Sequence, residues 1–278
     1  MTTSSIRRSP RSFRFTVRAF ALLALAALMA CCTRLTPTVD RVAGRSVELV
    51  EAGSGEVTVV FESGLGDDWE PWDDVASEVA LRTRVFAYSR PGYGDSDATP
   101  SPRDAATIVA DLKALLAARG VAPPYLLVGH SFGGTYMELF AKSHPEEVVG
   151  LVLVDSRHRD FTAACETARI GGCSIPASAV SSLPQVERDE FQAFAMSSGE
   201  IHAAGGFGAY PVRVLTATSH NGGSAAFEAL WTSMHGSLAR EAANGEQVVF
   251  NGAGHYLQIE ESEAVTQAIL RLLPAPRP

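Results

Sequence analysis

Short apolar runs alternate with longer amphipathic stretches along most of the chain. The runs at 125–128 and 148–154 contain no regularly spaced polar position. A strand with one face in water alternates apolar and polar residues, so uninterrupted runs indicate strands buried on both faces of a parallel sheet. Strands are predicted at 46–51, 57–62, 84–88, 125–128, 148–154, 212–216 and 247–250, with the first two adjacent and joined by the turn Gly53-Ser54-Gly55.

The amphipathic stretches between these runs predict helices. At 104–119, Ile108, Leu112 and Leu115 fall on one helical face. Residues 156–208 break the alternation with Pro, Ser, Gly and one charged helical stretch, so we interpret them as an inserted cap. The order of elements predicts an α/β fold with a mostly parallel central sheet, flanking helices and right-handed crossovers. The other predicted helices are 72–81, 135–143, 185–196, 225–243 and 262–273.

The first 30 residues have the features of an export signal. Five arginines and no acidic residue precede an Ala- and Leu-rich run at 19–30 that is short for a membrane span. The run ends in Leu-Met-Ala-Cys, which resembles a bacterial lipobox and makes Cys31 the expected lipidated residue. An ordinary signal that releases a periplasmic or secreted protein is the alternative. We expect a signal at 1–30, a linker at 31–40 and one α/β domain at 41–278.

Removal of that signal changes the charge of the protein. The chain has 23 basic and 31 acidic residues, and the loss of five arginines leaves 18 basic residues and a net charge of −13. Such an acidic domain is a poor partner for nucleic acids and anionic lipid surfaces. Membrane association is therefore expected only through an N-terminal lipid.

Two cysteines remain beyond Cys31 and its neighbour, and they also fit an exported protein. Cys165 and Cys173 are eight residues apart and can close a small loop in an oxidising compartment. Metal binding is the alternative, but no second cysteine pair or nearby histidine pair accompanies them. We expect a structural disulfide and no metal.

A Gly-x-Ser-x-Gly sequence lies between the predicted strand at 125–128 and the helix that follows it. In this position the pattern describes a sharp turn that exposes the hydroxyl of Ser131 at the end of a sheet. The alternative is a serine that caps the helix N-terminus. A serine nucleophile also needs a base, and His255 lies in a glycine-containing loop after the last predicted strand.

Four motifs in the same order resemble those of the α/β-hydrolase fold family. The segment at 63–66 resembles the oxyanion loop, although Ser63 stands where many members have histidine, and 89–96 resembles the Asp-x-x-Gly-x-Gly-x-Ser turn. The Gly-x-Ser-x-Gly sequence resembles the nucleophile elbow, and Gly254-His255 resembles the final histidine loop. The resemblance implies that backbone N–H groups of Leu65 and Phe132 form the oxyanion hole.

The resemblance also bears on the acid of the triad. The family most often carries it after the strand that follows the cap, but 212–221 contains no carboxylate. Some members carry it one strand earlier, where Asp155 follows the run 151–154. Asp155 is therefore the expected acid, and a helix-capping role is the alternative.

The implied activity is hydrolysis of a small carboxylic ester, or a related lactone, thioester or amide, through an acyl-enzyme. No cofactor is expected. Because this fold supports many chemistries, the alternative is a non-catalytic ligand-binding protein. The choice of substrate is expected to depend on the cap.

Overall fold

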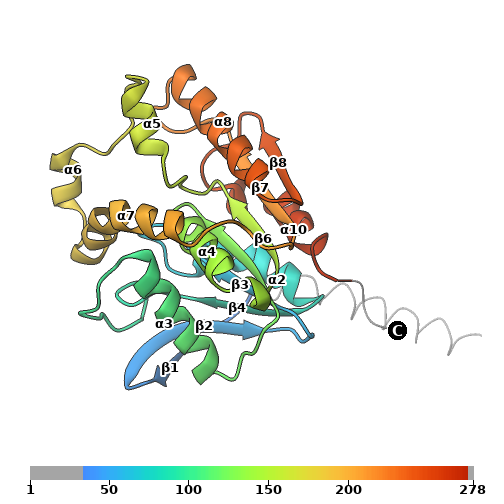
Figure 1. Ribbon diagram of the computed structural model, residues 1–278. Helices are drawn as coiled ribbons and strands as arrows, with labels where there is room; N and C mark the ends of the chain where they lie inside the picture. The colour runs from blue at the N-terminus through green and yellow to red at the C-terminus, as the bar shows by residue number, and fades with distance from the viewer. Residues whose placement is uncertain (1–33, 275–278) are drawn as a thin grey trace, which may run out of the picture. The chain divides into compact units, whose positions relative to one another are not determined.

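Eight strands form a mostly parallel sheet at the centre of residues 34–274, which are the residues that the computed structural model describes (Figure 1). The strand order is β1-β2-β4-β3-β5-β6-β7-β8, with β1 and β2 antiparallel to their neighbours and β3 to β8 parallel. The expected signal at 1–30 and the expected lipidation site Cys31 lie outside the described residues. The strands are β1 (Thr38–Val42), β2 (Arg45–Ala52), β3 (Thr58–Glu62), β4 (Arg84–Tyr88), β5 (Tyr125–His130), β6 (Val148–Val154), β7 (Val212–Ala217) and β8 (Gly245–Phe250).

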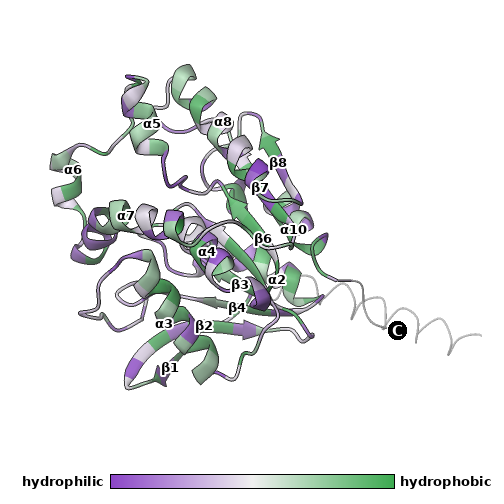
Figure 2. Cartoon of the chain, in the orientation of Figure 1, coloured by the Kyte–Doolittle hydropathy of each residue, from purple (hydrophilic) through white to green (hydrophobic). Residues whose placement is uncertain are grey.

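Both faces of the central strands are buried, which explains their uninterrupted apolar sequences. In β5, Leu127 belongs to the hydrophobic core on one face, whereas Leu126 and Val128 belong to the core on the other. Successive side chains of a strand point to opposite faces, so burial of both requires apolar residues at every position. In Figure 2, β6 is coloured as hydrophobic along the sheet.

Helices cover the two faces of the sheet. One core includes residues of α3 (Ala105–Ala118), α4 (Phe132–Ser143) and α8 (Ala225–Glu241). The other includes residues of α2 (Asp73–Ala80) and α10 (Ser262–Leu270). Asp104 caps α3, where its carboxylate accepts from the amide of Thr107 at 3.0 Å. The chain also forms the short helices η2 (Glu70–Trp72), η3 (Pro145–Glu147) and α9 (Leu257–Glu260).

The N-terminal strands differ from the sequence prediction in their pairing. The strands β2 and β3 were expected to be adjacent, but β4 lies between them and pairs with both. The hairpin partner of β2 is β1, an edge strand that the sequence analysis missed. The two join at Ala43 and Gly44, which have φ of 50° and 85°, so this turn supplies the reversal that we assigned to Gly53-Ser54-Gly55.

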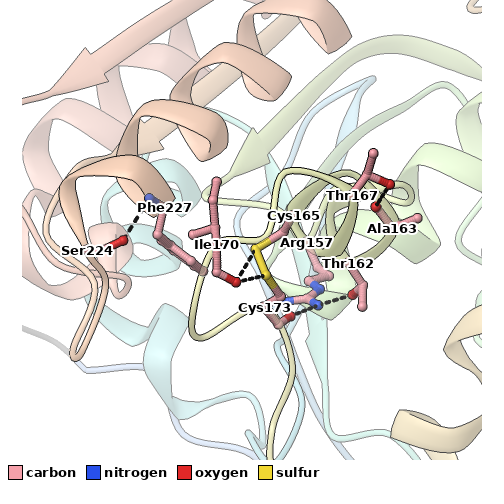
Figure 3. The surroundings of a disulfide bond; sticks show 9 residues. All are labelled: Arg157, Thr162, Ala163, Cys165, Thr167, Ile170, Cys173, Ser224 and Phe227. Carbon is pink, nitrogen blue, oxygen red and sulfur yellow. Dashed lines mark hydrogen bonds between the residues drawn. A yellow bond between two sulfur atoms is a disulfide. The ribbon is translucent and has the colours of Figure 1, made fainter.

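The segment from Asp155 to Pro211, called the β6–β7 segment below, contains three helices. They are α5 (Phe161–Thr167), α6 (Ala177–Ser182) and α7 (Gln185–Ala203). The helix α5 packs against α8, and α7 packs against α3 and α4. A disulfide joins Cys165 to Cys173 (Figure 3). Within residues 34–274, no helix combines the length and apolarity that a membrane crossing requires.

Candidate active site

The sharp turn between β5 and α4 carries Ser131. Its backbone has φ of 51° and ψ of −121°, a conformation that non-glycine residues rarely adopt. The Ser131 side chain makes no capping hydrogen bond with α4, so its position at the helix N-terminus does not use the hydroxyl. The turn thus presents the hydroxyl without committing it to the helix, and the capping interpretation is wrong.

Close backbone contacts explain the glycines of this turn. A Cβ on Gly129 would lie 2.6 Å from the carbonyl oxygen of Gly133, and a Cβ on Gly133 would overlap the carbonyl oxygens at the end of β3. Only glycine allows such approaches. The loop after β3 also passes close to the serine, because a Cβ on Gly64 would lie 3.3 Å from Cβ of Ser131.

The two residues expected to form the oxyanion hole lie on either side of this contact. Leu65 follows Gly64 in the loop after β3, and Phe132 is the first residue of α4. The first-turn amides of a helix have no partner within the helix, so the Phe132 N–H is available and lies at the positive end of the helix dipole.

Asp155 lies buried at the end of β6, the strand next to β5. Its φ of 41° turns the chain sharply, and both of its carboxylate oxygens accept hydrogen bonds. Oδ2 accepts from Nδ1 of His255 at 2.6 Å, and Oδ1 accepts from the amide of Ala217 at 2.9 Å. The predicted acid and the predicted base of the triad are thus in direct contact, although 100 residues of sequence separate them.

The hydrogen bonds of Asp155 keep it ionised. Burial alone would raise the pKa of the Asp155 carboxyl, but hydrogen bonds from His220 and His255 outweigh burial and hold the pKa well below its ordinary value. A charged carboxylate at Nδ1 fixes the His255 tautomer that leaves Nε2 without a proton and able to act as a base.

His220 is a partner of Asp155 that the sequence analysis missed. Its Nε2 lies 2.7 Å from Oδ2 of Asp155, and its Nδ1 lies 2.7 Å from Oε2 of Glu228. A carboxylate can only accept, so both ring nitrogens donate and the imidazole is a cation. Burial lowers the pKa of His220, but the hydrogen bonds and charges of Asp155 and Glu228 raise it overall.

Trp231 is a second partner of Asp155 that the sequence analysis did not identify. It comes from α8, and its Nε1–H donates to Oδ1 of Asp155 at 2.8 Å. No short sequence motif identifies an Asp at a strand end whose partners, an indole and a histidine, come from later elements. A weaker signal for His220 was available, because it lies just after β7, where the family most often carries the acid.

His130, the residue before Ser131, contacts His255. Its ring lies 4.6 Å, between centroids, from that of His255, and its Nε2–H donates to the carbonyl oxygen of His255 at 3.0 Å. Burial lowers the pKa of His130, so the ring is neutral. The residue before Ser131 therefore holds the loop that carries His255.

A buried ion network supports the loop that passes Ser131. The guanidinium of Arg90 donates to the carbonyl oxygens of Ser63 at 2.6 Å and Gly64 at 2.7 Å. It also pairs with Glu62 of β3 and with Glu190 of α7. Burial would raise the pKa of Glu190, but Arg90 and Arg103 lower it. The network thus connects the β6–β7 segment to the expected oxyanion loop.

A cavity of about 930 Å³ lies within the β6–β7 segment, which supplies all of its lining residues except Phe132 of the elbow. Phe132 lines it at the elbow, and Phe191 and Phe194 of α7 form an apolar wall. Its volume falls in the range of small-molecule sites. Trp69 and Trp72, which follow the expected oxyanion loop, do not line this cavity and are buried in the core that includes α2 and α10.

Two groups of described side chains have the spacing to hold a metal ion. In one, Asp155, His220 and His255 bring their ligand atoms together, but hydrogen bonds already join these atoms. The other consists of His144 and two glutamates of η3, which is partly exposed and remote from Ser131 in the fold.

Comparisons with known proteins agree with this architecture. Residues 57–176 match the family described as alpha/beta hydrolase fold. The uncharacterized protein YqjL of Bacillus subtilis (strain 168) is 38% identical over 103 residues, which cover 37% of this chain and 41% of that protein. The match therefore spans less than half of this curated relative.

Solved structures resemble the chain over more of its length. The epoxide hydrolase CorEH gives a TM-score of 0.64 at 19% identity and covers 86% of this chain and 98% of its own. A thermophilic esterase from Thermogutta terrifontis gives a TM-score of 0.57 at 21% identity and covers 86% and 97%. With the sheet order and the elbow described above, these likenesses show that the chain has the α/β-hydrolase fold.

Proposed function

We propose that the protein is a serine hydrolase that cleaves a carboxylic ester, or a related lactone, thioester or amide. The observation that carries this proposal is the 2.6 Å hydrogen bond between Asp155 and His255, whose carbonyl oxygen accepts from His130, the residue before a serine whose hydroxyl is not used as a helix cap. Hydrolase relatives such as the esterase and the epoxide hydrolase support the broader class.

The proposed reaction has two steps. The Oγ of Ser131 attacks the carbonyl carbon while Nε2 of His255 takes the hydroxyl proton. The oxyanion then accepts hydrogen bonds from the N–H groups of Leu65 and Phe132. Collapse releases the alcohol, which takes the proton from His255, and water hydrolyses the acyl-enzyme with His255 again as base.

Asp155 stabilises the imidazolium of His255 in both steps and keeps its own charge. His255 returns each proton that it takes, first to the leaving alcohol and then to Ser131, so the bonds that form and break balance. A non-catalytic binding protein is the alternative, but it gives no reason for a strained serine together with a histidine that is hydrogen-bonded to a buried carboxylate.

Covalent labelling tests this proposal. A fluorophosphonate probe should label the wild-type protein at Ser131, and Ser131→Ala should abolish the labelling. Ser156→Ala, at a neighbouring buried serine, is the matched control and should retain it. Equal labelling of the wild type and Ser131→Ala, or none of either, would reject a serine hydrolase.

We also propose export with lipid attached at Cys31, on the basis of the arginine-rich start, the apolar run and the lipobox-like sequence. Metabolic labelling with an alkyne fatty acid in a bacterial host should label the full chain. Cys31→Ser should remove the label, whereas Cys32→Ser should retain it. Labelling that persists in Cys31→Ser would contradict the proposal.

A further inference from the structure

Arg157 lies beside the elbow and faces the cavity described above. Its backbone N–H donates to the carbonyl oxygen of Ser131 at 2.9 Å. Its side chain lines the cavity together with Phe132, the residue after the serine. Backbone contact with the nucleophile thus places a guanidinium at a fixed position next to the site.

The charge of this guanidinium has no counterpart within residues 34–274. Nη2 donates to Oγ1 of Thr162 at 2.6 Å and lies 3.5 Å from the carbonyl oxygen of Cys173 (Figure 3). The guanidinium also packs over the rings of Phe161 and Phe194, at 5.4 Å and 5.6 Å from their centroids. The buried Nε has no hydrogen-bond partner among the described residues.

Other buried arginines of the described chain behave differently. Arg90 and Arg103 pair with Glu190, and Arg159 pairs with Glu138. Burial lowers the pKa of Arg157 to about 10, with no carboxylate to oppose it. A partly buried cation without a counter-charge costs free energy, and Arg90, Arg103 and Arg159 avoid this cost through their ion pairs.

Some of the other charged groups around the cavity have ionic partners. Arg159 also pairs with Glu241, and Asp160 pairs with His202. Arg188 also lacks a carboxylate partner among the described residues, and at the rim it donates to the carbonyl oxygen of Leu183 and to other neutral acceptors. The remaining acid, Glu166, is exposed. Of the two cavity arginines without a described carboxylate partner, Arg157 is the one whose backbone contacts Ser131.

We propose that the cavity selects esters that carry a carboxylate, with Arg157 as the residue that binds it. The carboxylate would accept hydrogen bonds from Nη1, which makes none with a described residue, and such charge-assisted bonds are stronger than neutral ones. The phenylalanines of α7 would contact the apolar part between the carboxylate and the scissile ester. This inference rests on the proposed function and adds the substrate class.

Two matched substrate pairs test the inference and separate the two possible positions of the carboxylate. Monomethyl adipate against methyl hexanoate places it in the acyl part, and 4-acetoxybenzoate against 4-methylphenyl acetate places it in the leaving group. In one of the two pairs, wild-type kcat/KM should be at least tenfold higher for the ester that carries the carboxylate than for the uncharged ester. Arg157→Gln should reduce that preference at least tenfold, and Arg157→Lys should retain part of it.

The exposed Arg169 of the same segment does not line the cavity, so Arg169→Gln is the matched control and should keep the preference. A wild type without preference in either pair, or a preference that survives Arg157→Gln, would overturn the inference. If Arg157→Gln does not fold, the wild-type preference and Arg157→Lys decide.

A readout without turnover separates this inference from the hydrolase proposal. Calorimetry should detect binding of monomethyl adipate to Ser131→Ala, at least tenfold tighter than binding to the double variant with Arg157→Lys. Binding with no hydrolysis of any ester by the wild type would reject the proposed function and support the carboxylate site. Hydrolysis without such binding or preference would support the proposed function and reject the carboxylate site.

Discussion

His220 donates to the same oxygen of Asp155 that accepts from His255. The two contacts measure 2.7 Å and 2.6 Å, and the imidazole rings lie 5.6 Å apart between centroids. A second carboxylate, Glu228, holds the other nitrogen of His220. The expected acid and base of the triad are therefore extended by His220 and by Glu228 of α8.

Removal of the His220 cation should change the pH dependence of turnover. The cation disfavours a second positive charge on His255, and it competes for Oδ2 of Asp155. In His220→Gln, protonated His255 is favoured, so the acid limb of the kcat/KM profile should move to higher pH by about 0.5 to 1 unit. The exposed His202 provides the control, and His202→Asn should leave the limb in place. An unchanged or lowered limb in His220→Gln would contradict the cationic assignment.

Replacement of Asp155 should affect turnover and stability in different ways. Asp155→Asn should lower kcat by about 10⁴, because the amide no longer fixes the base tautomer or stabilises the imidazolium. Four N–H donors face this side chain. The NH₂ group of an asparagine at this position would face some of these N–H groups with no acceptor between them, so Asp155→Asn should also lower the melting temperature. The surface variant Asp111→Asn should change neither quantity. Retention of activity would move the acid role elsewhere.

The lowered pKa of Asp155 has a consequence for acid stability. Because the folded-state pKa lies below the ordinary value of about 3.9, the ionised carboxylate stabilises the fold above about pH 4, and this stabilisation is lost as the pH falls further. The melting temperature of the wild type should therefore fall more steeply below about pH 4 than that of Asp155→Asn. Parallel curves would show that the carboxylate does not contribute in this way.

A Cβ at Gly133 should destabilise the elbow. It would overlap backbone oxygens at the end of β3, so strand and helix must separate, at a cost of about 1–3 kcal/mol. Gly133→Ala should lower the melting temperature by several degrees. A Cβ at Gly171 meets no atom within 4 Å, so Gly171→Ala should have little effect. Equal effects of the two substitutions on calorimetric melting would argue against the close contact.

Glu190 should matter for both the fold and the reaction. Glu190→Gln leaves Arg90 and Arg103 with one carboxylate fewer in a buried network, at a cost of about 3 kcal/mol, and loosens the carbonyls of Ser63 and Gly64 that Arg90 holds. Both the melting temperature and kcat should fall. Glu187→Gln on the same helix is the control, because Glu187 makes no ion pair with a described residue and lies near other carboxylates. A similar loss in both variants would show a general effect of charge on α7.

Much of the sheet could be predicted from the sequence, because a strand that is buried on both faces has an uninterrupted apolar run. Runs such as 148–154 are apolar at every position since each side chain enters one of the two cores. The edge strand β1 leaves no such trace, because its five residues are mostly exposed. The pairing of β2 with β4 depends on contacts between distant segments, which a turn-rich sequence between β2 and β3 does not specify.

The sequence by itself determined the candidate chemistry of the elbow. Glycines around a serine, between a buried strand and a helix, are a local requirement of one tight turn. Only the tertiary structure decided what surrounds that serine. The contacts of Asp155 with His220 and Trp231 span 65 and 76 residues. That Arg157 has no carboxylate partner among the described residues can be recognised only from the positions of the neighbouring side chains in the fold. Such relationships arise from strand order and helix packing, because side chains far apart in the sequence meet only when the sheet aligns the ends of its strands.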